Sequence, residues 1–294
     1  MNRRFAVVST LGLLGLAASG LAESQTVTSR DGTRIAYRVQ GQGQPALVFV
    51  HGWSCDSGYW DAQVAHFAPC HRVLAVDLAG HGASGAGRSE WTIAHFAEDV
   101  AAVAAQEKLD RVVLIGHSMG GPVCLEAARV LGDRALAVVG VDTFHDLDRL
   151  PSAEEFRQFV APFERDFPMA TAAFVRSMFT ETADPALVDR IAKDMASAPP
   201  QVALASFGAL FSYRAQDTLP KLHIPVFAIN ADKYPVKTEA VTRHGLAFDV
   251  KLMKGRGHFV AQEDPALFNR LLDEVLAGLA STPAAQAKGQ GNGG

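Results

Sequence analysis

Gly116-His117-Ser118-Met119-Gly120-Gly121 contains the pattern G-x-S-x-G. The apolar run 112–115 precedes it and the helix-like segment 122–131 follows it, which predicts a strand, a sharp turn and a helix. Glycines on both sides of Ser118 remove the β-carbons that would hold strand and helix apart. We expect Ser118 at the C-terminal end of a strand, below a helix N-terminus that stabilises a negatively charged substrate oxygen.

Length and composition favour one large domain. The chain has 294 residues, of which 48% are hydrophobic, so a single α/β domain with an insertion fits better than two independent domains. The formal net charge is -4 and no basic stripe is present, so nucleic acid is not an expected partner.

The first 22 residues have the pattern of a secretory signal peptide. Arg3-Arg4 are followed by the apolar run 5–16 and by Gly20-Leu21-Ala22, a small-x-small cleavage site. The apolar run is shorter than the roughly 20 residues that span a bilayer, so we expect no stable membrane span in the mature chain. The sequence therefore predicts an exported protein, periplasmic or secreted.

Three cysteines, Cys55, Cys70 and Cys124, are an odd number for an exported protein. A bridge between Cys55 and Cys70 is not expected, because a helix over 57–67 would separate them by about 15 Å, beyond the reach of a disulfide. Cys124 falls on the helix after Ser118, where we expect a buried, small, hydrophobic side chain.

Elsewhere, strand-like and helix-like segments alternate. Asp31-Gly32 joins 26–29 and 34–39 as an antiparallel hairpin. Further apolar runs predict strands at 46–50, 73–76, 112–115, 136–141, 226–229 and 248–252, and helical spacing occurs around 59–67, 93–109, 122–131, 237–243 and 265–279. This alternation predicts an α/β fold with a mostly parallel, doubly wound sheet.

The segment 145–218 breaks the alternation. It contains no β-like run and is rich in phenylalanine, which predicts a helical cap inserted into a core made of residues 23–144 and 219–280. For each phenylalanine, packing in the core is favoured over lining a cavity. The Ala/Gly/Gln-rich tail 281–294 is expected to be disordered.

A serine nucleophile needs a base within hydrogen-bond reach and a group that orients that base. His258 is the candidate base, because it follows the last predicted strand in Gly255-Arg256-Gly257-His258 and its glycine neighbours let a loop project the ring over the end of the sheet. His51, His81 and His117 lie in motif loops, where the ring more often bonds the backbone.

The chain resembles the α/β-hydrolase superfamily over roughly residues 26–280. The resemblance rests on His51-Gly52-Trp53, on 77–84, on 116–121 and on Gly257-His258, in that order. It implies the chain order serine, acid, histidine. It also implies that the backbone N–H groups of Trp53 and Met119 form the oxyanion hole.

The resemblance leaves two candidates for the acid. The commonest family position, read without gaps, falls on Tyr234, and Asp232 lies two residues before it. A subset of the family carries the acid after the strand that follows the nucleophile's helix, and Asp142 fits that position. Asp142 is favoured as the acid and Asp232 is the alternative. If they are not catalytic, Asp142 is expected to cap a helix N-terminus and Asp232 to form a turn.

These residues predict acyl transfer by an exported serine hydrolase that acts on a small or medium carboxylic ester. An amidase, a lactonase or a carbon-carbon hydrolase would use the same triad, and a ligand receptor on a hydrolase scaffold is a further alternative. No cofactor or metal is expected, because His51, His81 and His145 lack helical ligand spacing and an accompanying carboxylate motif. The expected partner is a small-molecule ester, and the oligomeric state stays open.

Overall fold

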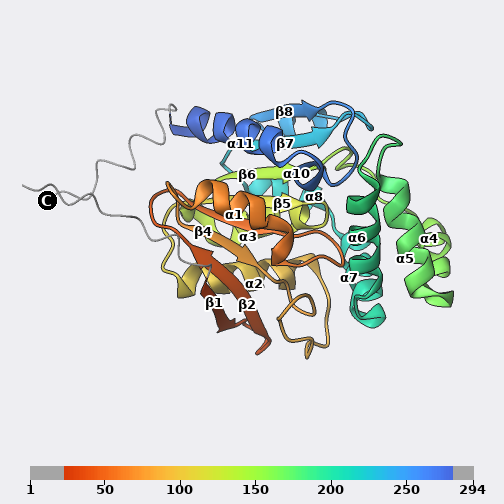
Figure 1. The fold of residues 1–294 in the computed structure, drawn as a ribbon. Coiled ribbons are helices and arrows are strands. Elements are labelled where there is room, and N and C mark those ends of the chain that lie inside the picture. The colour runs from red at the N-terminus through yellow and green to blue at the C-terminus, as the bar shows by residue number, and fades with distance from the viewer. Residues whose placement is uncertain (1–22, 281–294) are drawn as a thin grey trace, which may run out of the picture.

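Residues 23–280 are described by a computed structural model, in which an eight-stranded sheet lies between layers of helices (Figure 1). The predicted signal peptide, 1–22, and the predicted disordered tail, 281–294, lie outside the described residues. The mostly parallel, doubly wound sheet expected from the sequence is confirmed.

The strands are β1 (Glu23–Thr28), β2 (Arg34–Gln40), β3 (Ala46–Val50), β4 (Val73–Val76), β5 (Val112–His117), β6 (Ala135–Val141), β7 (Val226–Ala231) and β8 (Phe248–Met253). Their order in the sheet is β1-β2-β4-β3-β5-β6-β7-β8. The hairpin β1–β2 is antiparallel, as predicted, and β2 also runs antiparallel to β4. All pairs from β4 to β8 are parallel, so their C-terminal ends meet at one edge of the sheet.

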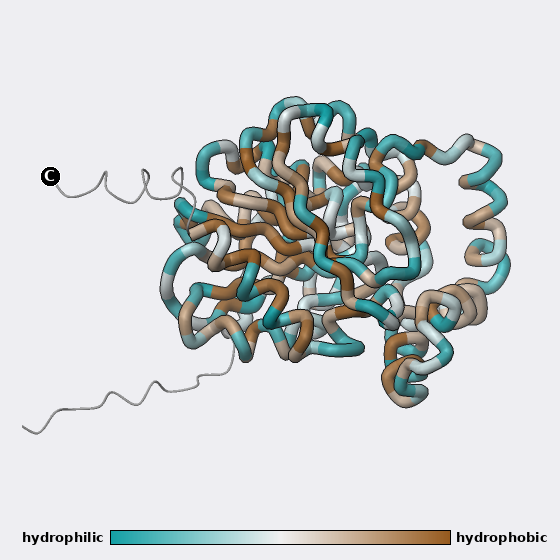
Figure 2. The backbone as a smooth tube through the Cα atoms, turned by 90° about the horizontal axis from the view of Figure 1, so that it is seen from above, coloured by the Kyte–Doolittle hydropathy of each residue, from teal (hydrophilic) through white to brown (hydrophobic). Residues whose placement is uncertain are grey.

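Two hydrophobic layers cover the sheet. Alternate residues of β3 point to opposite faces: Val48 and Val50 pack with α2 (Ile93–Gln106) and α3 (Gly120–Leu131), whereas Leu47 and Phe49 pack with α1 (Asp61–Phe67) and α11 (Pro265–Ala280). Burial on both faces explains why the central strands are uninterrupted apolar runs. Figure 2 shows them as hydrophobic segments inside a more hydrophilic surface.

Every regular secondary-structure element in the segment 145–218 is an α-helix, as predicted. It contains α4 (Ala153–Arg165), α5 (Phe167–Met178), α6 (Pro185–Ala196), α7 (Pro200–Ser212) and α8 (Ala215–Thr218). We call these five helices the cap. Figure 1 shows α4 to α7 gathered beyond one end of the sheet. Capping side chains set where they begin: Ser152 and Glu155 form a capping box on α4, and Asp166 and Asp184 cap α5 and α6.

The remaining elements are short. A 3₁₀ turn, Ser57–Trp60, precedes α1, so the predicted helix over 57–67 begins in the tighter form. α9 (Glu239–Thr242) is shorter than the predicted helix over 237–243, and α10 (Val260–Glu263) was not predicted. Cys55, Cys70 and Cys124 are free thiols, and Cys124 is buried as expected. Within residues 23–280, none of the helices has both the length and the apolar character to cross a bilayer.

Candidate active site

Ser118 lies in a tight turn between β5 and α3. Its backbone has a φ of 50°, a left-handed conformation that is uncommon for residues other than glycine, and its N–H donates to the carbonyl of Val141 at 2.9 Å. A β-carbon on Gly116 would lie 2.1 Å from the carbonyl oxygen of Gly120, and one on Gly120 would lie 2.5 Å from that of Val50. Both glycines are therefore required for the close approach of helix and strand that holds Ser118 in this conformation.

His258 and Asp142 meet at the C-terminal edge of the sheet. Asp142 follows β6 directly, and His258 lies in the loop between β8 and α10. His258 Nδ1 lies 2.6 Å from Asp142 Oδ2, while Asp142 Oδ1 accepts a hydrogen bond from the N–H of Ala231 at 2.9 Å. An ionised carboxylate can only accept hydrogen bonds, so His258 Nδ1 carries the proton. In the neutral ring the lone pair is then on Nε2.

The surroundings of Asp142 keep it ionised. Only 5% of its side chain is exposed, and burial by itself would raise the pKa of the carboxyl. His145 Nε2, at 3.6 Å from Oδ1, and the hydrogen-bonded His258 oppose this effect and lower the pKa well below its ordinary value. The charged carboxylate can therefore stabilise a protonated imidazole at His258.

Asp232, the alternative acid, lies in another environment. Its side chain is exposed, and Oδ1 accepts a hydrogen bond from the backbone N–H of Gly255 at 3.0 Å. The structure thus brings Asp142, and not Asp232, to the imidazole of His258. The contact to Gly255 gives Asp232 a local role in joining two loops.

Trp53 and Met119, the residues named for the oxyanion hole, follow the ends of the neighbouring parallel strands β3 and β5. Both side chains are buried, at 4% and 0% exposure. Met119 directly precedes α3, so its N–H belongs to the positive end of that helix. The two residues flank Ser118 at the edge of the sheet where negative charge on a substrate oxygen would be stabilised.

A cavity of about 230 Å³ joins the sheet edge to the cap, and both Ser118 and His258 line it. The rest of its wall is largely aromatic and aliphatic: Trp53, Cys55, His117, Phe159, Phe174, Met178, Met195, Phe207, Leu210, Phe211 and Phe259. Four cap phenylalanines, Phe159, Phe174, Phe207 and Phe211, line this space from helices α4, α5 and α7, although Phe207 is also buried in the core and the other three pack against it. Phe163, Phe167 and Phe179 are buried, as the expectation of core packing required.

Three histidines of the sequence motifs, two in loops and His117 at the end of β5, bond the backbone, as the sequence indicated. His51 Nδ1 lies 2.8 Å from the carbonyl of Gly52, and its Nε2 accepts from the N–H of Leu78 at 3.0 Å. His81 Nδ1 lies 2.9 Å from the carbonyl of Ala79. His117 Nε2 lies 3.0 Å from the carbonyl of His258, and burial lowers the pKa of His117 to about 3, so it stays neutral. These contacts fix the loops that carry Trp53 and His258.

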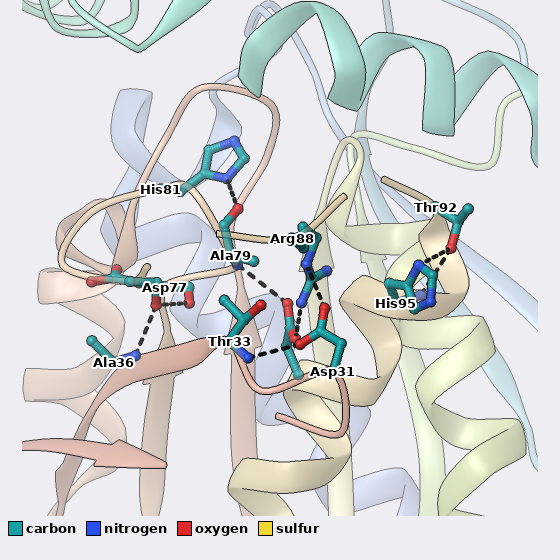
Figure 3. A network of polar contacts seen from close by, with 11 residues as sticks. Asp31, Thr33, Ala36, Asp77, Ala79, His81, Arg88, Thr92 and His95 are labelled. Carbon is teal, nitrogen blue, oxygen red and sulfur yellow. Dashed lines mark hydrogen bonds and ion pairs between the residues drawn. The ribbon is translucent and has the colours of Figure 1, made fainter. Parts of the chain in front are cut away.

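A buried polar network supports the loop between β4 and α2 (Figure 3). Arg88 forms ion pairs with Asp31 at 3.0 Å and with Asp99 at 2.5 Å, and Asp99 also accepts from the N–H of Ala79. Asp77 accepts from the N–H groups of residues 57 and 83. Sequence reasoning missed Arg88 and Asp99, because nothing in their local sequence indicates that the two side chains meet. Within residues 23–280, no group of three or more His, Cys, Asp or Glu side chains could hold a metal ion.

Curated relatives match parts of the chain or most of it. A non-heme haloperoxidase of Rhodococcus erythropolis is 43% identical over 96 residues, which is 32% of this chain and 35% of that protein. A bifunctional esterase/perhydrolase of Acinetobacter calcoaceticus is 40% identical over 97 residues, which is 32% of this chain and 35% of that protein. The chain thus spans about a third of the length of these two relatives.

Solved structures match over nearly the whole described chain. A thermophilic esterase from Thermogutta terrifontis has a TM-score of 0.77 at 25% identity, covering 88% of this chain and 99% of that one. An enol-lactonase from Burkholderia xenovorans has a TM-score of 0.76 at 22% identity, covering 86% and 100%, which shows a common fold. The model of the alpha/beta hydrolase family matches residues 47–271. Because that match spans well over half of the sequence, the chain belongs to the alpha/beta hydrolase family.

Proposed function

We propose that the chain is a serine hydrolase that cleaves a small or medium carboxylic ester through an acyl-enzyme on Ser118. His258 is the general base and Asp142 orients it. The observation that carries the proposal is the 2.6 Å contact between His258 and Asp142 beside a cavity that both Ser118 and His258 line.

In the proposed reaction these groups act in two steps. His258 Nε2 takes the proton of the Ser118 hydroxyl as Ser118 Oγ attacks the carbonyl carbon, and the resulting oxyanion is stabilised by the N–H groups of Trp53 and Met119. The protonated imidazole, stabilised by the Asp142 carboxylate, then gives its proton to the leaving alcohol oxygen. Water activated by His258 attacks the acyl-enzyme in the second half of the reaction and releases the acid and Ser118.

Ester cleavage is favoured because relatives described as esterases occur among both the curated proteins and the solved structures. An amide, a lactone or an activated carbon-carbon bond would meet the same nucleophile and base. A panel of one acyl group presented as ester, anilide, lactone and ketone separates these classes by kcat/KM, and we expect the ester to be cleaved fastest.

The proposal extends to export of the protein, which is supported by the signal-peptide pattern of residues 1–22 alone.

The nucleophile is tested with a fluorophosphonate probe and mass spectrometry. We expect one adduct per chain, on Ser118, and none in Ser118→Ala. Ser212→Ala is the matched control, because the Ser212 hydroxyl donates to a carbonyl of its own helix at 2.7 Å and should leave labelling unchanged. An unlabelled native protein, or equal labelling of Ser118→Ala, would contradict the assignment.

Repeated turnover of p-nitrophenyl butyrate by the purified protein would exclude the alternative that the chain is a ligand receptor without hydrolytic activity.

A further inference from the structure

A second cavity lies against the same histidine. It has a volume of about 210 Å³ and shares His258, Phe174 and Met178 with the cavity that contains Ser118. We call the one that Ser118 lines the first cavity and the other the second cavity. The remaining wall of the second cavity is formed by Asp142, Ser177, Ala231, Lys233 and Tyr234. Thus His258, Phe174 and Met178 line both cavities, which have similar volumes.

The two cavities differ in chemistry. Apart from the reacting groups and His117, the wall of the first cavity is aromatic, aliphatic or sulfur-containing and carries no charged side chain. A charged group would lose its hydration there without a partner, so this space favours an uncharged, apolar substituent. Its volume, about 230 Å³, lies below the roughly 300–1,000 Å³ of sites for drug-sized ligands and therefore favours a small or medium group.

The second cavity carries an ammonium group at Lys233. Lys233 Nζ donates to the carbonyl of Ser177 at 2.9 Å and lies 5.6 Å from the centre of the Tyr234 ring. An ammonium has three donors, so two remain for another acceptor. Within the described chain, the lysines that form ion pairs with carboxylates are Lys237 and Lys251, not Lys233. The carboxylate of the neighbouring Asp232 accepts from the N–H of Gly255. The Asp142 carboxylate is already held by His258 and Ala231.

The proposed reaction fixes which half of an ester enters each cavity. The carbonyl carbon must lie at Ser118, with its oxygen near Trp53, and both residues line the first cavity. The leaving oxygen must receive a proton from His258, so the leaving group departs on the side of that imidazole. The second cavity adjoins the same imidazole, shares Phe174 and Met178 with the first cavity, and is not lined by Ser118. An apolar acyl group therefore fits the first cavity, and an alcohol part that extends past His258 would reach the second cavity and Lys233.

We propose that the substrate is an ester of an apolar, uncharged carboxylic acid with an alcohol that carries an anionic group, and that Lys233 binds this anionic group. The inference rests on the proposed function and adds its substrate class. Hydrolysis breaks the bond between the carbonyl carbon and the ester oxygen, water supplies the oxygen of the released acid, and the anionic alcohol leaves with the proton from His258. Lys233 is a specificity-determining residue that contacts the leaving group.

The test compares two butyrate esters of similar shape, one of 4-hydroxybenzoate, which is anionic, and one of 4-hydroxybenzamide, which is neutral. We measure the ratio of kcat/KM for the anionic ester to that for the neutral ester. We expect Lys233→Gln to lower this ratio about threefold, which corresponds to one favourable charge interaction at an exposed site. Lys233→Arg should retain most of the preference, and raising the salt concentration should reduce it in the native protein.

Lys237→Gln is the matched control. Lys237 lies four residues further along the chain, is exposed and pairs with Asp146 at 2.6 Å outside both cavities, so its removal should leave the ratio unchanged. A second comparison keeps 4-hydroxybenzamide as the alcohol and replaces butyrate by succinate. We expect the anionic acyl group to be cleaved much more slowly.

Three outcomes would overturn the inference. The first is a ratio that Lys233→Gln leaves unchanged, and the second is an equal loss in Lys237→Gln, which would indicate a general surface charge effect. The third is a preference for the succinyl ester, which would reverse the assignment of the cavities. In each case continued cleavage of the neutral butyrate ester would leave the proposed hydrolase function intact. Failure to cleave any ester, together with no labelling of Ser118, would reject both.

Discussion

The indole N–H of Trp53 donates a hydrogen bond to the backbone carbonyl of Ala203 at 2.7 Å, in helix α7 of the cap. The same indole stacks on Phe207 with ring centroids 3.9 Å apart and planes inclined by 15°. The backbone N–H of Trp53 is a proposed oxyanion donor, and its side chain is embedded in the cap. The cap therefore holds the loop after β3 in position as well as enclosing the cavity.

Trp53→Phe should weaken this connection, because it keeps an aromatic ring but leaves the carbonyl of Ala203 without its donor. We expect a loss of about 1–3 kcal/mol in the free energy of unfolding. We also expect a larger fall in kcat than change in KM, since a displaced oxyanion donor acts mainly in the transition state. Denaturant unfolding and steady-state kinetics measure the two effects. Trp91→Phe, which lines neither cavity, should change stability alone.

Asp142→Asn should lower kcat by on the order of 10⁴, as removal of the orienting carboxylate does in serine triads. The amide keeps the shape of the side chain but cannot stabilise an imidazolium at His258. Steady-state hydrolysis of p-nitrophenyl butyrate measures the loss. Asp232→Asn is the control and should cost far less, because the Asp232 carboxylate accepts from the Gly255 backbone N–H, whereas Asp142 contacts His258. The reverse ranking would assign the orienting role to Asp232.

His81→Asn should flatten the dependence of stability on pH. Burial, with a smaller contribution from nearby His51, lowers the pKa of His81 to about 3. Between that value and the unfolded pKa of about 6.5, the unfolded chain binds a proton that the folded chain does not, so stability falls as pH falls. One such group contributes a slope of about 1.4 kcal/mol per pH unit. Asn keeps a donor for Ala79 and does not titrate.

Denaturant unfolding at pH 7, 6, 5 and 4 measures this slope in both proteins. His223→Asn, which changes an exposed histidine, is the control. A slope that is as steep in His81→Asn as in the native chain would show that His81 does not resist protonation in the folded state.

Arg88→Met should destabilise the chain by about 3–5 kcal/mol, because it leaves the fully buried Asp99 carboxylate without its ion pair. The double variant Arg88→Met, Asp99→Leu should be more stable than Arg88→Met, since it removes the unpaired charge as well. Chemical unfolding of the single and double variants tests this. Arg30→Met, which breaks an exposed pair with Glu98, should cost less than about 1 kcal/mol.

Local pattern was sufficient to predict most of the sheet. Strands β3 and β5 are continuous apolar runs because both faces are buried. The glycines around Ser118 indicated the tight turn, and the structure has no room for a β-carbon at Gly116 or Gly120. Chain order placed Asp142 after a strand next to that of Ser118, and the structure then brings it to His258. The pairing of β1 with β2 followed from the turn-forming dipeptide Asp31-Gly32.

Contacts between distant segments were beyond that reasoning. Helical periodicity predicts that Phe207 is buried but not that it also lines a cavity, because that depends on how α7 rotates against Trp53. The Arg88–Asp99 pair and the contact between His145 and Asp142 depend on loop conformations that no local signal specifies. Likewise, nothing around Lys233 in the sequence indicates a cavity next to His258.

The cap departs from the sheet after β6 and returns at β7, and these two strands are direct neighbours, with Val138 paired to Val226. A segment whose two junctions lie side by side can be exchanged for one of different length without altering strand order. Asp142 lies just before the cap and His258 lies after it, so both proposed catalytic side chains belong to the part of the chain outside the cap. Replacement of the cap could therefore change which substrates are bound without changing the strands and loops that carry Ser118, Asp142 and His258.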